Sequence, residues 1–173
     1  MSDWYMLTLI GKDRPGIVAR VTSALFEAGC NLGETSMLRL GNNFTIMMMV
    51  RSETGSPALQ RVLEPVVANL GLILHIDVID AELHQRPVPE VRILVHGADR
   101  AGIVAQVTTC AAQAGLNILD LESDVAGTAS NPIYILQIEG TAEQGIEAIE
   151  AALAPLRADG VKVEVQAVDT MIG

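Results

Sequence analysis

The chain contains few aromatic residues, few basic residues and only two cysteines. Aromatic residues make up 3% of the 173 positions, so a hydrophobic core has to be built from Val, Ile, Leu, Ala and Met. Lys and Arg total 11 against 21 Asp and Glu, which gives a formal net charge of −10. No basic stripe interleaved with aromatics offsets this charge. Such a surface repels phosphate backbones, so we expect no direct binding of nucleic acid.

Long apolar runs are also missing. None approaches the roughly 18 residues that a membrane-spanning helix needs, and residues 1–5 lack the basic and apolar segments of a signal peptide. We therefore expect a cytoplasmic protein without a membrane partner. Cys30 and Cys110 do not occupy matching positions in the repeat described next, which favours small apolar core residues over a redox pair.

One stretch of the chain occurs twice. Residues 11–32 and 97–118, at an offset of 86, share their loop glycines, an Asp-Arg pair, Ile-Val-Ala, Val-Thr, Ala-Gly and an asparagine. Matches between so many chemically different residues at one unbroken offset indicate a duplication. We predict one domain at 1–84, a short proline-containing linker at 85–90 and a second domain at 91–173.

Each half has the same predicted order of elements: strand, helix, strand, strand, helix, strand. Apolar spacing predicts first-half strands at 4–10, after residue 31, at 44–51 and at 72–80, and helices at about 15–28 and 57–70. The second half has predicted strands at 91–96, 117–125, 132–139 and 161–168, a turn region at 126–131, and helices at about 101–114 and 142–158. This order predicts an α+β fold of two ferredoxin-like βαββαβ domains, each with four antiparallel strands and both helices on one face. Right-handed crossovers place the first and third strands in the centre.

Several local features are also predicted. Asp13 and Ser56 are expected to cap the two first-half helices, and Pro65 predicts a kink or break near 61–65. The strand after Asn31 alternates and should be half-exposed, whereas strand 44–51 is apolar on both faces and should be buried on both. The open sheet face then needs a cover from the other half or from another chain, so we expect a homo-oligomer.

The repeated loop Gly-x-Asp-Arg-x-Gly joins a central strand to a helix N-terminus, where free N–H groups and the helix dipole favour a small carboxylate. An asparagine follows each helix stop, and we expect it at the same end of the fold as the loop, where it can recognise an amino group or a carboxamide. The candidate ligand-binding residues are Gly11, Asp13, Arg14, Gly16 and Asn31, with Gly97, Asp99, Arg100, Gly102 and Asn117 in the second half.

A purely structural interpretation fits the same residues. The glycines then shape a tight turn, the aspartates cap helices, the asparagines bond to local backbone, and the arginines are solvated or paired with carboxylates. The loop is neither a phosphate-binding loop nor a dinucleotide motif. His75, His84 and His96 lack metal-ligand spacing, and no Cys-His or Ser-His-Asp set is present. We expect no enzyme activity, no metal and no cofactor.

The motif Gly-x-Asp-Arg-Pro-Gly-Ile-Val, a helix ending in Ala-Gly-x-Asn, and the strand order together resemble an ACT domain, the small-molecule-sensing module of amino-acid metabolism. The resemblance covers nearly the whole chain as two tandem domains and is greatest to the glycine cleavage system transcriptional repressor group. It implies a regulator that binds a small amino acid, with glycine as a candidate. Such a regulator controls transcription of glycine or one-carbon metabolism through a protein partner such as a transcription regulator.

The resemblance also implies how a ligand is held. Its carboxylate meets the glycine-containing loop, and the asparagine takes its polar groups at a domain interface. The second copy departs at Ala101, which stands in place of Pro15, and in a longer hairpin at 127–132, so the two sites should be unequal. Two other functions stay open: a ligand-free oligomerisation module, and a small acyl-phosphate hydrolase that uses an arginine and an asparagine.

Overall fold

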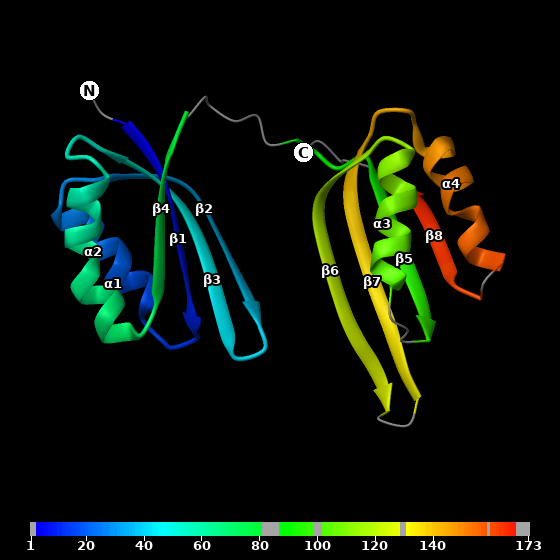
Figure 1. The fold of residues 1–173 in the computed structure, drawn as a ribbon, viewed down its shortest axis with the longest axis horizontal. Coiled ribbons are helices and arrows are strands. Elements are labelled where there is room, and N and C mark those ends of the chain that lie inside the picture. The colour runs from blue at the N-terminus through cyan, green and yellow to red at the C-terminus, as the bar shows by residue number, and fades with distance from the viewer. Residues whose placement is uncertain (1–2, 81–86, 99–101, 129–130, 159, 169–173) are drawn as a thin grey trace. The chain divides into compact units, whose positions relative to one another are not determined.

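The computed structural model describes residues 3–80, 87–98, 102–128, 131–158 and 160–168. The chain divides into two compact units, Met1–His84 and Gln85–Gly173, and each unit is one βαββαβ fold (Figure 1). The elements of the first unit are β1 Asp3–Lys12, α1 Ile17–Glu27, β2 Asn31–Leu40, β3 Asn43–Ser52, α2 Ser56–Leu70 and β4 Ile73–Ile79. Those of the second are β5 Val91–Ala98, α3 Ile103–Gln113, β6 Leu116–Thr128, β7 Asn131–Ala142, α4 Ile146–Ala158 and β8 Lys162–Ala167. The predicted element order and fold class are confirmed.

Each unit has one four-stranded antiparallel sheet. The strand order is β2-β3-β1-β4 in the first unit and β6-β7-β5-β8 in the second. The first and third strands of each unit are therefore central, as the crossover rule predicts. The last strand, β8, lies at an edge, as its alternating sequence indicates.

The core of the first unit lies between its two helices and one face of its sheet. Tyr5, Leu7 and Leu9 alternate along β1 with residues that are only half-buried. The inward face of β3 and the apolar faces of α1 and α2 complete a single buried cluster. Each fully buried leucine contributes about 1.5–3 kcal/mol to folding, so this layer is a main stabilising feature of the unit. The second unit repeats the arrangement with its own buried cluster.

Two predictions of strand burial are wrong. Strand β3 is not covered on both faces, because Met47 on the open face is 46% exposed, although Met49 beside it is buried. Strand β2 is exposed along its whole length and not along alternate residues. Both differences follow from the topology, since the helices cover one face only and β2 is an edge strand of the sheet.

The predicted helix starts also need correction. Helix α1 begins at Ile17, and Gly16 is its N-cap residue with no side-chain cap, so Asp13 is not a cap. Gly55 is the N-cap residue of α2, so Ser56 is not a cap either. The predicted glycine stop at Gly71 is confirmed by its left-handed φ of 65°.

Helix α2 continues through Pro65 from Ser56 to Leu70, so the predicted break is absent. A proline inside a helix costs one backbone hydrogen bond. Leu59 and Leu63 before the proline and Leu70 after it are all buried in the same core. This shared burial favours one continuous helix over two shorter segments.

The β6–β7 hairpin is longer than predicted. Strand β6 extends to Thr128 and β7 begins at Asn131, so most of the predicted turn region belongs to the strands. Strand β7 also continues to Ala142, which delays the start of α4 to Ile146. Glu90, in the predicted linker, forms backbone hydrogen bonds on both sides. Its N–H donates to Gly140 O of β7 at 2.9 Å, and its carbonyl accepts from the N–H of Val168, directly after β8, at 2.9 Å.

No helix within the described ranges is long and apolar enough to cross a membrane. Both cysteines are free. Cys30 is buried in the first core, and Cys110 is half-buried against the second.

Candidate functional site

The loop between β1 and α1 forms a sharp corner at one end of the first sheet. Gly16 turns the chain with a φ of 86°, and Gly102 does the same in the second unit with a φ of 89°. A Cβ atom at either position would meet no heavy atom within 4 Å. Glycine is therefore needed at both positions for its backbone conformation and not because of crowding.

A cavity of about 350 Å³ lies at this corner, which we call the corner cavity. Its lining comes from the loop, the first turn of α1 and one side chain each from β2 and β3: Asp13, Arg14, Gly16, Ile17, Val18, Ala19, Met37 and Phe44. The first amides of a helix have no partner within the helix, and the dipole places partial positive charge there. The corner cavity thus combines an anion-favouring end with mostly apolar walls.

Asp13 ties the corner to the neighbouring hairpin. Its carboxylate Oδ2 pairs with Arg39 Nε of β2 at 2.8 Å, and its backbone N–H donates to Asn42 O at 2.9 Å. This arrangement replaces the predicted helix cap. The carboxylate is occupied by a guanidinium, so its role at the rim of the cavity is to hold the loop against β2 and β3.

Gly11 and Gly97, the first glycines of the two loops, have different surroundings. A Cβ atom on Gly11 would lie 2.5 Å from Leu72 Cδ2 and 3.3 Å from the carbonyl oxygen of Gly71. A Cβ atom on Gly97 would meet only Ile103 Cδ1, at 3.6 Å. Close packing therefore accounts for glycine at position 11 but not at position 97.

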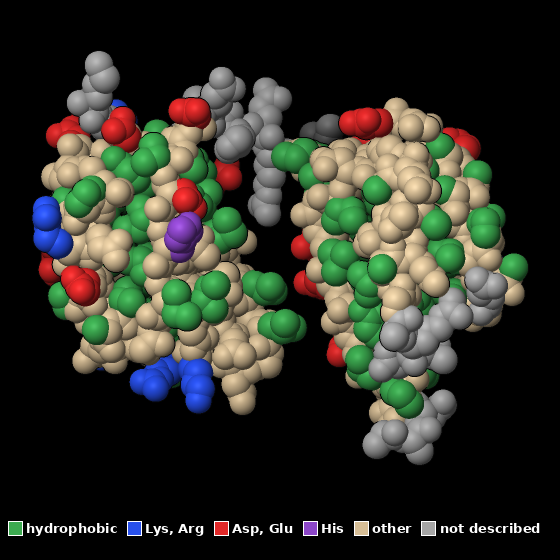
Figure 2. Space-filling model, in the orientation of Figure 1, with side chains coloured by type: hydrophobic (Ala, Val, Ile, Leu, Met, Phe, Trp, Pro, Cys, Tyr) green, Lys and Arg blue, Asp and Glu red, His purple; other side chains and the backbone are tan. Residues whose placement is uncertain are grey.

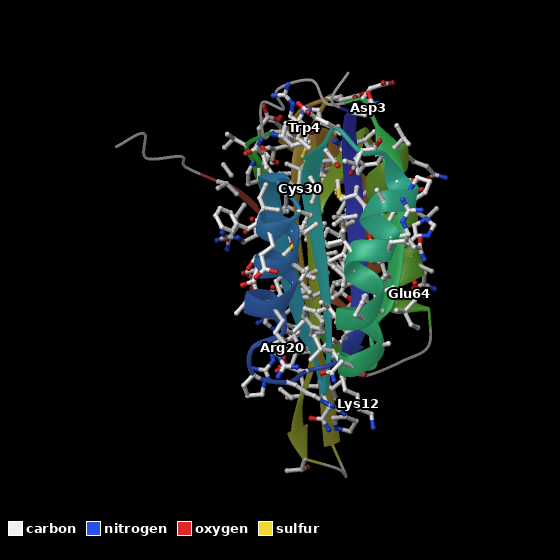
Figure 3. The ribbon with its side chains drawn as sticks, turned by 90° about the vertical axis from the view of Figure 1, so that its left-hand side faces the viewer. Asp3, Trp4, Lys12, Arg20, Cys30 and Glu64 are labelled. Carbon is white, nitrogen blue, oxygen red and sulfur yellow. The ribbon has the colours of Figure 1, made fainter. Side chains whose placement is uncertain are left out.

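Asn31 lies at the other end of the sheet from the corner, so the expectation that both lie at one end is wrong. Asn31 pairs with Arg51, which pairs with Trp4 at the start of β1, whereas Gly11 pairs with Phe44. Seven residues along a strand correspond to roughly 23 Å. Figure 3 shows the same separation, with Trp4 and Cys30 near one end of the first unit and Lys12 near the other.

The reason for this separation is the direction of the helix. Helix α1 has 11 residues and returns along the sheet, so its C-terminus lies at the end where β1 begins. The second unit repeats the geometry, because Asn117 pairs with Thr141 whereas Gly97 pairs with Tyr134. In the first domain the loop and Asn31 therefore do not meet, and in the second domain Gly97 and Asn117 do not meet.

A second cavity of the first unit, of about 370 Å³, lies at the Asn31 end, and we call it the polar cavity. Its lining is Ala28, Gly29, Asn31, Arg51, Ser52, Glu53 and Thr54. Sequence reasoning identified Asn31 but missed the residues from β3 and the loop after it. The sequence did contain a signal for Arg51. The predicted hairpin turn at Gly41 lies midway between Asn31 and Arg51, and residues equally far from a turn pair across the two strands.

Two predicted site residues and the three histidines, which were not predicted to form a site, remain to be placed. Asp99 and Arg100 lie outside the described residues, as does His84. His75 lies in β4 and His96 in β5, as interpreted from the sequence. His75 Nε2 is 3.1 Å from Asp77 Oδ2 on an exposed surface. Across the described part of the chain, no group of three or more His, Cys, Asp or Glu residues is placed to hold a metal ion.

Comparison with known proteins gives a consistent family. The sequence profile of the ACT domain matches residues 5–77 and 91–166. The glycine cleavage system transcriptional repressor of Escherichia coli K12 is 26% identical over 165 residues, covering 93% of this chain and 80% of that protein. The UPF0237 protein YjhC of Lactococcus lactis is 35% identical over 72 residues, covering 41% of this chain and 83% of that protein.

Among solved structures, an unknown protein from Galdieria sulphuraria superposes with a TM-score of 0.79 at 23% identity, covering 98% of this chain and all of that one. This likeness supports the fold. The profile match covers one βαββαβ unit in each half and most of the chain. The protein therefore belongs to the ACT domain family, with two ACT domains in tandem.

Proposed function

We propose that this ACT-domain regulatory protein binds a small amino acid at the corner cavity of its first domain and passes that signal to a protein partner. The observation that carries the proposal is the corner cavity itself, which opens at the N-terminus of α1. The amides of the first helical turn favour a carboxylate. Arg14 lines the same cavity and adds a positive charge.

The walls of the corner cavity bear on the choice of ligand. Ile17, Met37 and Phe44 line it, and Ile17 and Phe44 are almost fully buried. Apolar walls favour a ligand with an apolar side chain, because such a side chain leaves water on binding. The name of the Escherichia coli relative makes glycine the first candidate. Glycine has no side chain to fill the apolar part of the corner cavity, so a test has to include larger amino acids.

The amino group of the ligand needs a second set of residues. Asn31 and Asn117 lie at the far ends of their own sheets, so neither reaches the corner of its own domain. In our proposal the asparagine that completes a site comes from a second copy of the chain. Binding would then be coupled to how domains associate, which is a route from ligand to partner.

The open face of the first sheet supports association. Ile10, Leu38, Met47 and Ile73 lie on the face opposite the helices and are 44–70% exposed. Hydrophobic side chains are visible on the surface of this unit in Figure 2. A connected apolar surface of this kind is typical of protein interfaces. We propose a homo-oligomer in which these faces are covered.

The proposed output is transcriptional control of glycine or one-carbon metabolism through a protein partner such as a transcription regulator. The name of the Escherichia coli relative supports this role, and the net charge of −10 supports contact with a protein rather than with DNA. No step of the proposal is catalytic and none needs a cofactor.

Calorimetry and thermal unfolding with each of the twenty amino acids test the proposal. A ligand at 100 times its Kd should stabilise the fold by about 2.7 kcal/mol. Gly16→Ala, which puts a side chain on a left-handed residue of the corner, should weaken the response. Gly102→Ala makes the same change in the second domain and is the matched control. If no amino acid at millimolar concentration changes the unfolding temperature, the protein is a ligand-free association module instead.

A further inference from the structure

We propose that the outer face of α1 is a self-association surface, at which two copies of the chain pack their α1 helices antiparallel. The helices of the first domain cover one face of its sheet, so this surface lies on the side away from the open sheet face. The inference does not rest on the proposed function, because it needs neither a ligand nor the contact between open sheet faces.

A groove runs between α1 and α2 on the outer surface of the first domain, and we call it the helix groove. Its volume is about 530 Å³. The α1 side has the small side chains of Ala19, Ser23 and Ala24, and the α2 side has Pro65 and Val66. Figure 3 shows the two helices side by side on this face of the sheet. The helix groove is therefore a hollow with mostly apolar walls and room for a large side chain from outside.

Phe26 is the most exposed large hydrophobic side chain in the described part of the chain, at 80%. It lies in the last turn of α1 and does not line the helix groove of its own domain. Taking such a ring out of water is favourable, and a single copy of the chain leaves it in water. The occupant that we propose for each helix groove is the Phe26 ring of a second copy.

Two charges on α1 are placed for this pairing. Arg20 and Glu27 both line the helix groove. They are seven residues apart, which is two helical turns and about 10 Å, so they lie on one face of α1. When two α1 helices pack antiparallel about a twofold axis between Ser23 and Ala24, Arg20 of each copy lies beside Glu27 of the other. The same register sets Phe26 against the first half of the other α1. The contact is isologous, so it closes at a dimer.

The helix dipole favours the same arrangement. Arg20 lies near the N-terminus of α1, where the dipole is positive, and Glu27 is the last residue, where it is negative. Each charge is thus at the less favourable end of its own helix and at the favourable end of an antiparallel neighbour.

Arg20 is also held in position. Its Nη1 donates to Asn69 Oδ1 at 2.8 Å. The amide of Asn69 is neutral and takes one of five guanidinium donors, so this bond orients Arg20 without offsetting its charge. Among the described residues, Glu27 has no ion-pair partner. The charges of the groove are therefore left to be matched by a second copy.

The second domain lacks all three side chains that the pairing uses. At the repeat offset, Gln106, Ala112 and Gln113 stand in place of Arg20, Phe26 and Glu27. Both charges and the aromatic ring are replaced together, as expected if they act as one set. The proposed surface is thus a feature of the first domain alone.

The test is sedimentation velocity of the full chain over a wide range of protein concentration. All measurements use a Met47→Glu background, which places a charge on the open sheet face and removes association through it. Met47 is 46% exposed, so the new carboxylate stays in water in the folded chain. The background chain should form a reversible dimer.

Charge reversal identifies the contact. Arg20→Glu leaves two acidic groups on the surface and Glu27→Arg leaves two basic groups, so like charges meet in either homodimer. Each change should weaken self-association by at least about tenfold. An equimolar mixture of the two variants should associate again, because every arginine then faces a glutamate.

Two further measurements complete the set. Phe26→Ala, which installs the residue of the second domain, should weaken association by about tenfold or more. Lys162→Glu and Glu164→Arg make the same charge changes on exposed positions of β8 and are the matched controls, with unchanged association expected. Unaltered circular dichroism establishes that each variant is folded.

The inference is overturned if the background chain stays monomeric at every concentration, or if either charge variant of α1 associates as strongly as the background chain. It is also overturned if the equimolar mixture associates no more than its components. If Met47→Glu has no effect on the unaltered chain while the α1 variants do, the sheet-face contact of the proposed function fails and the α1 contact stands.

Discussion

Replacing Gly11 with alanine should destabilise the first domain, whereas the same change at Gly97 should not destabilise the second. The two glycines occupy matching positions of the duplicated stretch, and neither has a positive φ. The new Cβ atom at Gly11 lies 2.5 Å from Leu72 Cδ2 and 3.3 Å from Gly71 O, so both a buried side chain and the backbone have to move. The nearest atom to a Cβ at Gly97 is Ile103 Cδ1, at an ordinary contact distance of 3.6 Å.

The expected magnitudes follow from these contacts. Forcing an extra methyl group into a packed site costs about 1–3 kcal/mol. Replacing a glycine by alanine without strain stabilises a protein by about 0.4–1 kcal/mol, because the unfolded chain loses freedom. We therefore expect a clear loss of stability for Gly11→Ala and a neutral or slightly positive effect for Gly97→Ala.

Urea unfolding followed by two probes measures the difference. Trp4 is the single tryptophan and lies in the first domain, so its fluorescence reports that domain alone. With a slope of about 1–3 kcal/mol per molar urea, the Gly11→Ala midpoint should fall by about 1 M. The second probe is the set of NMR amide signals of the second domain, which reports how Gly97→Ala changes the stability of that domain. Equal losses in the two variants, or no loss in Gly11→Ala, would refute the packing argument.

Three further predictions concern the first domain. Leu63 is fully buried, so Leu63→Ala should cost about 2–5 kcal/mol in the same assay. The Asp13–Arg39 pair is partly exposed, so Asp13→Asn should lower the free energy of unfolding by less than about 1 kcal/mol. At about 1 M salt, the urea midpoints of this variant and the unaltered chain should differ less than at low salt, because salt screens the pair. Burial, with the nearby Asp3 carboxylate, raises the pKa of Tyr5 above 10.0. The folded state thus holds the phenolic proton more tightly than the unfolded state, so the contribution of Tyr5 to folding stability is complete below pH 10 and is lost as the pH rises further. Urea midpoints measured between about pH 9 and 11 should show this loss of stability. Tyr5→Phe should abolish this pH dependence.

The fold was predictable because local signals agreed with the topology. The alternation of Tyr5, Leu7 and Leu9 marks the covered face of β1, and the glycine at 71 ends α2 where the apolar spacing stops. The duplication then gave every element a second, independent copy. Right-handed crossovers restrict the strand order of a βαββαβ unit, which is why the central strands could be assigned without coordinates.

The site was less predictable because its parts depend on distances in space. Asn31 closely follows the helix that begins at the corner, yet the helix carries the chain back along the sheet before Asn31 is reached. Asp13 was expected to cap a helix, but Arg39 on β2 competes for the carboxylate. Neither outcome leaves a local signal in the sequence. Counting the pairing of the β2–β3 hairpin would have brought Arg51 to Asn31.

A crystal structure of the full chain grown with the amino acid that gives the largest thermal stabilisation tests the central claim most directly. We predict ligand density in the corner cavity of the first domain, with its carboxylate at the first turn of α1 beside Gly16. Density that lies only elsewhere, or no density at a concentration well above the measured Kd, would contradict amino-acid sensing at this corner.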